Sequence, residues 1–163
     1  MQLLIQFYPA IATTVAMFFY KRDNRRMQSF YRRMALSLSA RKLFVSLLMI
    51  AMLIYNFCYL QAPGMNVALW IGTILCISMF SFRLAEKSLY VLQNRIYLAV
   101  AVIPMLVCVV QPGLLPLSVN LYFIFMGSLF YPSRKLQNRL DNPETFTRFC
   151  ANRDAAIKDY YSR

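Results

Sequence analysis

The sequence contains no histidine and few acidic residues, and both shortages restrict its chemistry. Its 163 residues include 18 Lys and Arg, 6 Asp and Glu, and no His. The absence of His removes the usual haem ligands, the commonest metal ligand and the most frequent general base near neutral pH. The 4 Cys residues are widely spaced and include no CxxC pair, which indicates packing residues with reduced thiols. We therefore expect no metal and no cofactor.

The motifs of common enzyme classes are missing as well. There is no GxSxG elbow, Walker loop, HExxH motif or GxGxxG fingerprint, and 4 Gly residues leave little material for a phosphate-binding loop. Asp141 and Glu144 lie close together in the sequence. They are better explained by a helix start, with Asn142 as the N-cap and Pro143 at the first helical position. We expect that the chain is not an enzyme.

Hydrophobic residues are abundant and fall into long apolar segments. They make up 60% of the chain, and charged residues make up 15%, against about 45–50% and about 25% in ordinary soluble domains. The segments are residues 3–20, 43–60, 67–82, 96–110 and 114–131. A helix of about 18 residues covers roughly 27 Å, close to the roughly 30 Å hydrocarbon core of a bilayer. The sequence therefore predicts an all-α membrane protein with about five transmembrane helices, a leading helix and two short-turn hairpins, in a domain of residues 1–131.

The basic residues all lie outside these segments, in three blocks. The blocks are the connection 21–42, the short region from Arg83 to Arg95, and the tail 132–163. The turns QAPGMN and QPG between paired segments carry no charge. Because short loops rich in Lys and Arg stay in the cytoplasm, we expect a multi-pass protein of the bacterial inner membrane with a basic cytoplasmic face and a cytoplasmic C-terminus. The N-terminus is periplasmic if segment 3–20 spans the membrane, as its length favours, and cytoplasmic if that segment turns back.

The basic connection 21–42 has the pattern of a helix that lies on a membrane surface. Its apolar residues recur at steps of three, four and seven from Met27 to Leu38. The other face carries Arg25, Arg26, Arg32 and Arg33. We expect these four arginines to contact anionic lipid headgroups. The alternative is a solvated loop that only sets orientation. No nucleic-acid-binding motif accompanies the charge, so we expect no nucleic-acid partner.

Two asparagines are the strongly polar side chains at membrane depth. Asn56 lies in the second apolar segment and Asn120 in the fifth. An amide in hydrocarbon is stabilised by a hydrogen bond to a neighbouring helix. We therefore expect both residues to form interhelical hydrogen bonds, and the alternative is a contact with a partner subunit or a ligand in the bilayer.

The tail 132–163 predicts a cytoplasmic amphipathic segment. After the helix start at Pro143, an incomplete apolar stripe includes Phe146, Phe149 and Ile157. A short half-apolar helix has little stability alone, so its stripe needs a surface to pack on. That surface is either the bilayer or another protein. We expect Phe146, Phe149 and Ile157 to bind a partner.

Two short motifs resemble those of a known group of proteins. They are Phe7-Tyr8-Pro9 in the first segment, and residues 115–120 (LPLSVN) followed by Ser128-Leu129 and Pro132 in the last. These motifs resemble sequences in small bacterial polytopic membrane proteins that are encoded beside aryl polyene and fatty-acid-like biosynthesis enzymes. The likeness covers under a third of the chain. It implies an accessory role.

Three functions are compatible with these features. No Asp, Glu, Lys or Arg lies inside the apolar segments, which disfavours a proton- or ion-coupled transporter. The first hypothesis is a non-enzymatic accessory or assembly subunit of a membrane-bound machine for secretion or envelope biosynthesis, with other integral membrane proteins as partners. The second is an immunity or exclusion protein against a pore-forming toxin or an incoming element. The third is a small uncoupled transporter. A biosynthetic or secretion operon would favour the first, and a neighbouring toxin gene the second.

The distribution of charge makes a testable prediction about topology. Cys150 lies in the basic tail, so it should face the cytoplasm. In intact cells it should react with a membrane-permeant maleimide and not with an impermeant one. Labelling of Cys150 from outside would contradict the predicted orientation.

Overall fold

The fold is described from a computed structural model, and the described residues are 11–16, 18–20, 24–60, 67–151 and 160–161. These residues form helices and no strand. The elements are α2 (Arg25–Leu36), α3 (Leu38–Leu60), α4 (Val67–Ser78), α5 (Phe82–Val91), α6 (Arg95–Val110), η1 (Pro112–Leu114), α7 (Leu115–Phe130), α8 (Arg134–Leu140) and α9 (Pro143–Ala151). Residues 11–16 and 18–19 are also helical. The prediction of an all-α protein is confirmed for this part of the chain.

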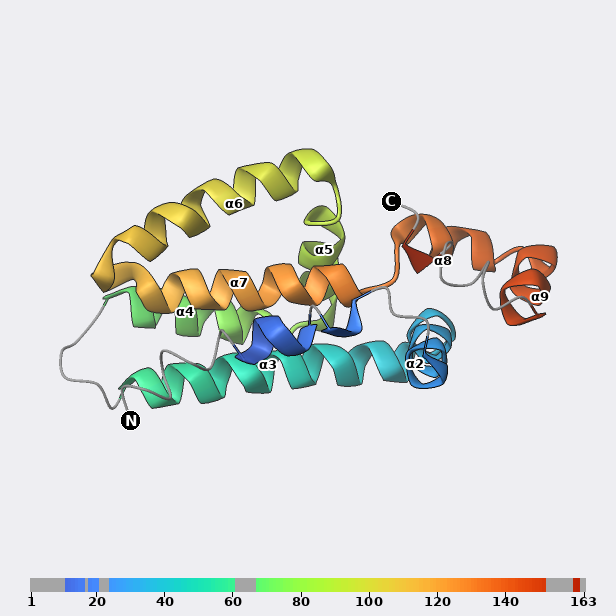
Figure 1. The fold of residues 1–163 in the computed structure, drawn as a ribbon, viewed down its shortest axis with the longest axis horizontal. Helices are drawn as coiled ribbons and strands as arrows, with labels where there is room; N and C mark the ends of the chain where they lie inside the picture. The colour runs from blue at the N-terminus through green and yellow to red at the C-terminus, as the bar shows by residue number, and fades with distance from the viewer. Residues whose placement is uncertain (1–10, 17, 21–23, 61–66, 152–159, 162–163) are drawn as a thin grey trace.

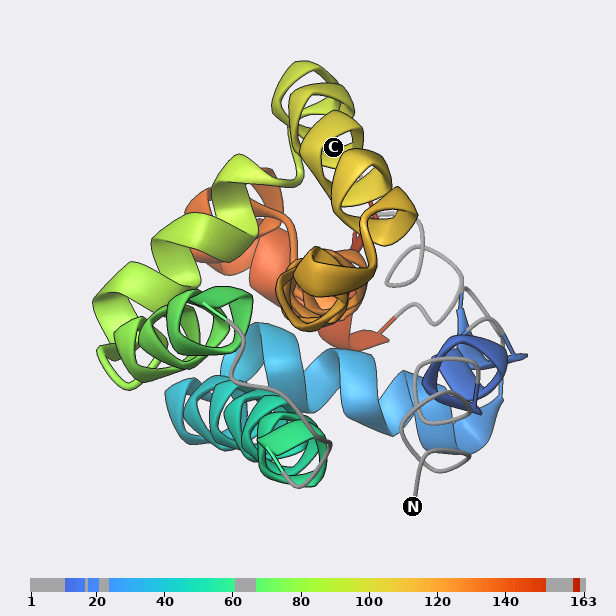
Figure 2. The same cartoon turned by 90° about the vertical axis from the view of Figure 1, so that its left-hand side faces the viewer.

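Helix α7 forms the centre of the fold. It packs against α3, α4, α5 and α6, and the end-on view in Figure 2 places it between the other long helices. Its sequence provides the small and polar side chains that such a position needs, because Ser118, Asn120, Gly127 and Ser128 are all buried. Large apolar side chains are exposed on the outer faces of α3, α4 and α6, among them Phe57, Ile74 and Ile103.

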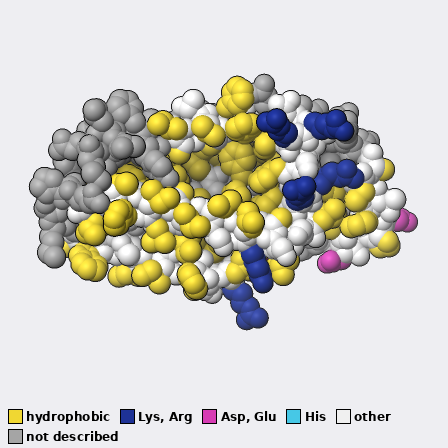
Figure 3. All heavy atoms as spheres, turned by 90° about the horizontal axis from the view of Figure 1, so that it is seen from below, with side chains coloured by type: hydrophobic (Ala, Val, Ile, Leu, Met, Phe, Trp, Pro, Cys, Tyr) yellow, Lys and Arg dark blue, Asp and Glu magenta, His cyan; other side chains and the backbone are white. Residues whose placement is uncertain are grey.

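The two ends of the bundle differ in charge. Helices α2, α5, α8 and α9 lie at one end, and η1 lies at the other, where α3 ends and α4 begins (Figure 1). We call these the basic end and the turn end. In the view from below, Lys and Arg side chains gather toward the basic end, and hydrophobic side chains cover much of the remaining described surface (Figure 3). This separation follows the charge blocks of the sequence.

The structure contains fewer candidate membrane spans than the sequence predicts. Among the described residues, α3 with 23 residues and the stretch Leu115–Leu140 with 26 are long and apolar enough to cross a bilayer. Helices α4 and α5 pass the same test together, although they are bent by 106° at their junction. The apolar part of α6, Ile96–Cys108, is shorter. The described part of the chain therefore has two candidate spans, or three if the bent pair is one span, and the predicted count of about five is not confirmed.

The predicted apolar segment 67–82 is not one helix, because α4 ends at Ser78 and α5 begins at Phe82. After Ser78, the N–H groups of Met79, Phe80 and Ser81 bond to carbonyls three residues back, which tightens the last turn. The chain then starts α5 in a new direction. With 12 residues, α4 is about 18 Å long, which is shorter than the hydrocarbon core. Part of segment 3–20 lies outside the described residues, so its span stays a prediction.

Polar side chains cap the starts of several helices. The Ser37 hydroxyl accepts from the Ala40 N–H at 3.3 Å, and thereby separates α2 from α3 inside the predicted connection 21–42. At α8 the Ser133 hydroxyl accepts from the Leu136 N–H at 3.2 Å. The predicted helix start in the tail is confirmed, since α9 begins at Pro143 and the Asn142 side chain accepts from the Glu144 N–H at 3.1 Å.

A hydrogen bond between two asparagines joins α3 to α7 in the core. Asn120 Nδ2 donates to Asn56 Oδ1 at 2.7 Å and to the Pro116 carbonyl at 2.8 Å. Both side chains are buried. Helix α4 approaches the pair at Gly72, where an added Cβ would lie 2.6 Å from Asn120 Nδ2. The two residues predicted to bond between helices thus bond to each other, and a glycine makes room for them.

The Gly72→Ala variant tests this packing. Its methyl group should push the Asn120 amide away from Asn56 and lower the free energy of unfolding by about 1–2 kcal/mol. In an Asn120→Ala background the same change should cost less than about 0.5 kcal/mol, because the clashing amide is gone. Thermal unfolding in detergent, followed by circular dichroism, measures both. An equal cost in the two backgrounds would show that Gly72 acts independently of Asn120.

Candidate functional site at the basic end

Glu86 is the centre of a polar cluster at the basic end. Its Oε1 atom accepts from Arg41 Nη1 at 3.1 Å, from the Tyr131 hydroxyl at 2.8 Å and from the Tyr90 hydroxyl at 3.3 Å. Arg41 lies on α3, Glu86 and Tyr90 on α5, and Tyr131 directly follows α7. One carboxylate oxygen therefore connects three helices that are far apart in the sequence.

The surroundings of this cluster are aromatic and partly buried. The Arg41 and Glu86 side chains are 15% and 22% exposed, and no other ion pair occurs between residues that the structure describes. The Tyr131 ring packs edge-on against Tyr90 at a centroid distance of 5.4 Å, and the Phe44 ring lies tilted to it at 6.3 Å. Removing one partner from such a pair is costly because the remaining charge is left without compensation.

Gln93 caps the C-terminal end of α7 beside the cluster. Its buried Nε2 atom donates to the carbonyls of Tyr131 and Pro132, both at 3.1 Å. The last carbonyls of a helix have no partner within the helix, and a buried helix end needs such a donor. Gln93 therefore fixes where the chain leaves α7 and enters α8.

Sequence reasoning did not identify this cluster. Arg41 and Glu86 are 45 residues apart, and each lies in a basic block that the charge distribution already explains. The available signal was the spacing of Glu86 and Tyr90, which places both on one face of a helix. That spacing does not indicate which distant residue meets them.

A polar cavity lies beside the Arg41 side chain. It has a volume of about 390 Å³ and lies between the α2–α3 junction, α8 and α9, with Leu36, Arg41, Gln137 and Phe146 among its lining residues. Arg41 Nε and Gln137 Nε2 are buried, and neither has an acceptor within the described part of the chain. Buried donors of this kind are normally bonded to protein, water or a ligand. Both residues line the cavity, and an acceptor placed there would reach these two nitrogens only after the side chains shift toward it.

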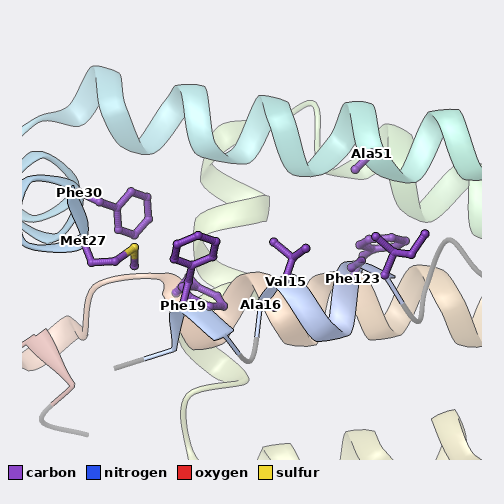
Figure 4. Close-up of a pocket in the computed structure, with 10 residues that line it drawn as sticks. Val15, Ala16, Phe19, Met27, Phe30, Ala51 and Phe123 are labelled. Atoms are coloured by element: carbon purple, nitrogen blue, oxygen red, sulfur yellow. The ribbon is translucent and has the colours of Figure 1, made fainter. Parts of the chain in front are cut away.

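An apolar groove lies on another side of the molecule. It has a volume of about 540 Å³, and all ten residues that line it are apolar. In Figure 4 the side chains of Val15 and Phe19, of Met27 and Phe30 on α2, and of Phe123 on α7 surround it. Without a polar lining, the groove can hold a hydrocarbon chain but cannot orient a polar group.

The positions of the four arginines allow the predicted contact with lipid headgroups. Arg25, Arg26, Arg32 and Arg33 are all exposed on α2. The opposite face of α2, however, is covered by this chain, because Tyr31 and Met34 are buried in its core. Arg32 also bonds within the molecule, from Nη2 to the Cys150 carbonyl at 2.6 Å. The headgroup contact of these arginines stays a prediction.

The residues of the predicted partner-binding stripe in the tail differ in burial. Phe149 is buried in the core of this chain, whereas Phe146 is 45% exposed. Ile157 lies outside the described residues. The end of the tail also returns to the bundle, since the Tyr160 hydroxyl donates to the Phe130 carbonyl at 2.6 Å, and burial raises the pKa of Tyr160. Of the two described residues in the stripe, only Phe146 presents its side chain at the surface.

The Glu86→Gln variant tests the cluster. It should lower the free energy of unfolding by about 2 kcal/mol, because Arg41 loses its charged partner in a partly buried position. The matched control is Glu144→Gln, which removes an exposed acid from α9 and should change stability by less than about 0.5 kcal/mol. Chemical unfolding in detergent compares the two. Equal effects would contradict a structural role for the Glu86 carboxylate.

Comparisons with known proteins give no further assignment. No protein-family model, no curated protein and no solved structure matches this chain. The resemblance to membrane proteins encoded beside aryl polyene enzymes therefore stays a prediction.

Proposed function

We propose that the protein is a non-enzymatic accessory or assembly subunit of a membrane-bound machine for secretion or envelope biosynthesis, and that its basic end binds another integral membrane protein of that machine. The observation that carries this proposal is the polar cavity between the α2–α3 junction, α8 and α9. It combines buried donors without acceptors and apolar side chains at the surface. These are the features of a surface that receives a protein segment.

The donors and the apolar residues of this cavity complement each other. Arg41 Nε and Gln137 Nε2 have no acceptor among the described residues, and a shift of these side chains toward the cavity would let backbone carbonyls of a partner accept from them. Leu36 and Phe146 line the same cavity and are 42% and 45% exposed. Aromatic side chains beside fully desolvated polar groups are typical of the residues that contribute most to binding.

Other polar side chains bond within the protein, which favours a non-catalytic role. The Glu86 carboxylate already accepts from three donors, and Asn56 and Asn120 bond to each other. These groups hold helices together. A catalytic acid or base needs a free position within hydrogen-bonding reach of a substrate; Oε1 of Glu86 is taken by these donors, which leaves its second oxygen alone for such a role.

The separation of charge supports a membrane orientation. We propose that the chain crosses the bacterial inner membrane about five times, with α4 as a short span that ends where the chain bends into α5, and α6 as another that extends into its flanks. The basic end would then be cytoplasmic, because short basic connections stay on that side. In this arrangement the polar cavity and the C-terminal tail face the cytoplasm.

Photo-crosslinking in cells tests the proposed binding surface. A photoreactive phenylalanine analogue at position 146 should give one discrete protein adduct, which mass spectrometry should identify as an integral membrane protein of the same machine. The matched control is position 57, also a phenylalanine, which is 62% exposed on α3. There we expect lipid adducts and no discrete protein band.

Other patterns would contradict the proposal. A discrete adduct at position 57 to a pore-forming toxin or a protein of an incoming element, with none at position 146, would favour the immunity or exclusion hypothesis. Adducts at position 146 to soluble proteins alone would exclude a membrane partner at this surface.

A further inference from the structure

A second cavity at the basic end has three cations in its lining. It has a volume of about 470 Å³ and lies where α5, the start of α6 and the start of α8 come together. Arg83, Lys87 and Arg134 line it, with Asn94 and Tyr97 as polar neighbours. We call it the basic cavity. It differs from the polar cavity in its residues and in its charge.

The charges of the basic cavity are not balanced. Glu86 is the one acid in its lining, and this carboxylate is paired with Arg41. Arg83, Lys87 and Arg134 form no ion pair with any residue whose position the structure gives. Arg83 and Lys87 are four residues apart on α5, so they point to the same side of the helix. Among the described residues, the cavity therefore has three cations without an ion-pair partner.

The surface beside the basic cavity is apolar. Helix α6 leaves this region at Ile96 and runs toward the turn end (Figure 1). Ile96, Val100 and Ile103 are 71%, 61% and 64% exposed along it. A cationic cavity at the start of a helix with exposed apolar side chains matches a molecule with an anionic head and a hydrocarbon tail.

We propose that the basic cavity binds the phosphate of an anionic amphiphile, with a membrane phospholipid as the natural source. Arginine forms paired hydrogen bonds with phosphate oxygens, and lysine adds a compact charge. The hydrocarbon chains would then lie along α6. This site is separate from the arginines of α2, and it does not rest on the proposed accessory role. A soluble phosphate compound offers the same head chemistry, so the experiment must distinguish the two sources.

Calorimetric titration of the full-length protein in detergent micelles tests the proposal. The probes are a short-chain phosphatidylglycerol, the phosphatidylcholine of equal chain length, and inorganic phosphate. Phosphatidylglycerol should bind saturably and more tightly than phosphatidylcholine. In the variant Arg83→Gln/Lys87→Gln it should bind about tenfold more weakly, because two cations next to the phosphate are lost.

A matched control separates a built site from general surface charge. The variant Lys135→Gln/Arg139→Gln removes two exposed cations with the same spacing from α8, and it should bind phosphatidylglycerol as the original protein does. Equal weakening in both double variants would overturn the proposal, and so would equal affinity for the two lipids. If the binding of inorganic phosphate depends on Arg83 and Lys87 in the same way, the phosphate site stands and its natural ligand is a soluble phosphate compound.

A single variant covers the case in which the double variant does not fold. Arg134→Gln changes an exposed residue on a different helix, and circular dichroism verifies its helix content. It should bind phosphatidylglycerol a few-fold more weakly. Unchanged affinity in a folded Arg134→Gln protein would overturn the proposal.

Discussion

The hydrogen bond between Asn56 and Asn120 is the contact on which the arrangement of the long helices depends. Apolar side chains gain little by exchanging lipid for another helix, so polar bonds and close packing decide which helices meet in a membrane. Asn120 lies on α7, the helix that contacts α3, α4, α5 and α6. Its bond to Asn56 selects α3 as a neighbour, and Gly72 lets α4 reach the same point. The position of α7 at the centre follows from these contacts.

The bend between α4 and α5 determines the chemistry of the basic end. The chain turns by 106° between α4 and α5. Glu86 on α5 bonds to Arg41 and Tyr131, which fixes α5 against α3 and the end of α7. The same turn leaves Arg83 and Lys87 beside the cluster, in the wall of the basic cavity. One change of helix direction thus produces both a stabilising ion pair and an unbalanced positive surface.

The parts of this structure that were predictable from sequence are those marked by neighbouring residues or by the distribution of charge along the chain. Charge blocks separated by apolar segments anticipated the two different ends, and Asn142 and Pro143 marked the start of α9. The role of Asn56 and Asn120 followed from the cost of a polar group in hydrocarbon. The pairing of Arg41 with Glu86 was not predictable, because it depends on the bend after Ser78, and the apolar run 67–82 gives no sign of it. The burial of Phe149 was missed for a similar reason, since only tertiary packing shows which apolar residue of a tail is covered.

Arg41 links the two cavities of the basic end. Its Nη1 atom bonds to Glu86, which lines the basic cavity. Its Nε atom has no acceptor among the described residues, and the side chain lines the polar cavity. A ligand that moves this guanidinium toward the polar cavity would leave Glu86 with its two tyrosine donors and an uncompensated negative charge. That charge would weaken the attraction of the basic cavity for an anion, and an anion bound there would in turn favour Arg41 remaining on Glu86. Linkage between two sites is reciprocal. Occupation of one cavity would then oppose occupation of the other, because both ligands act on the position of the Arg41 side chain.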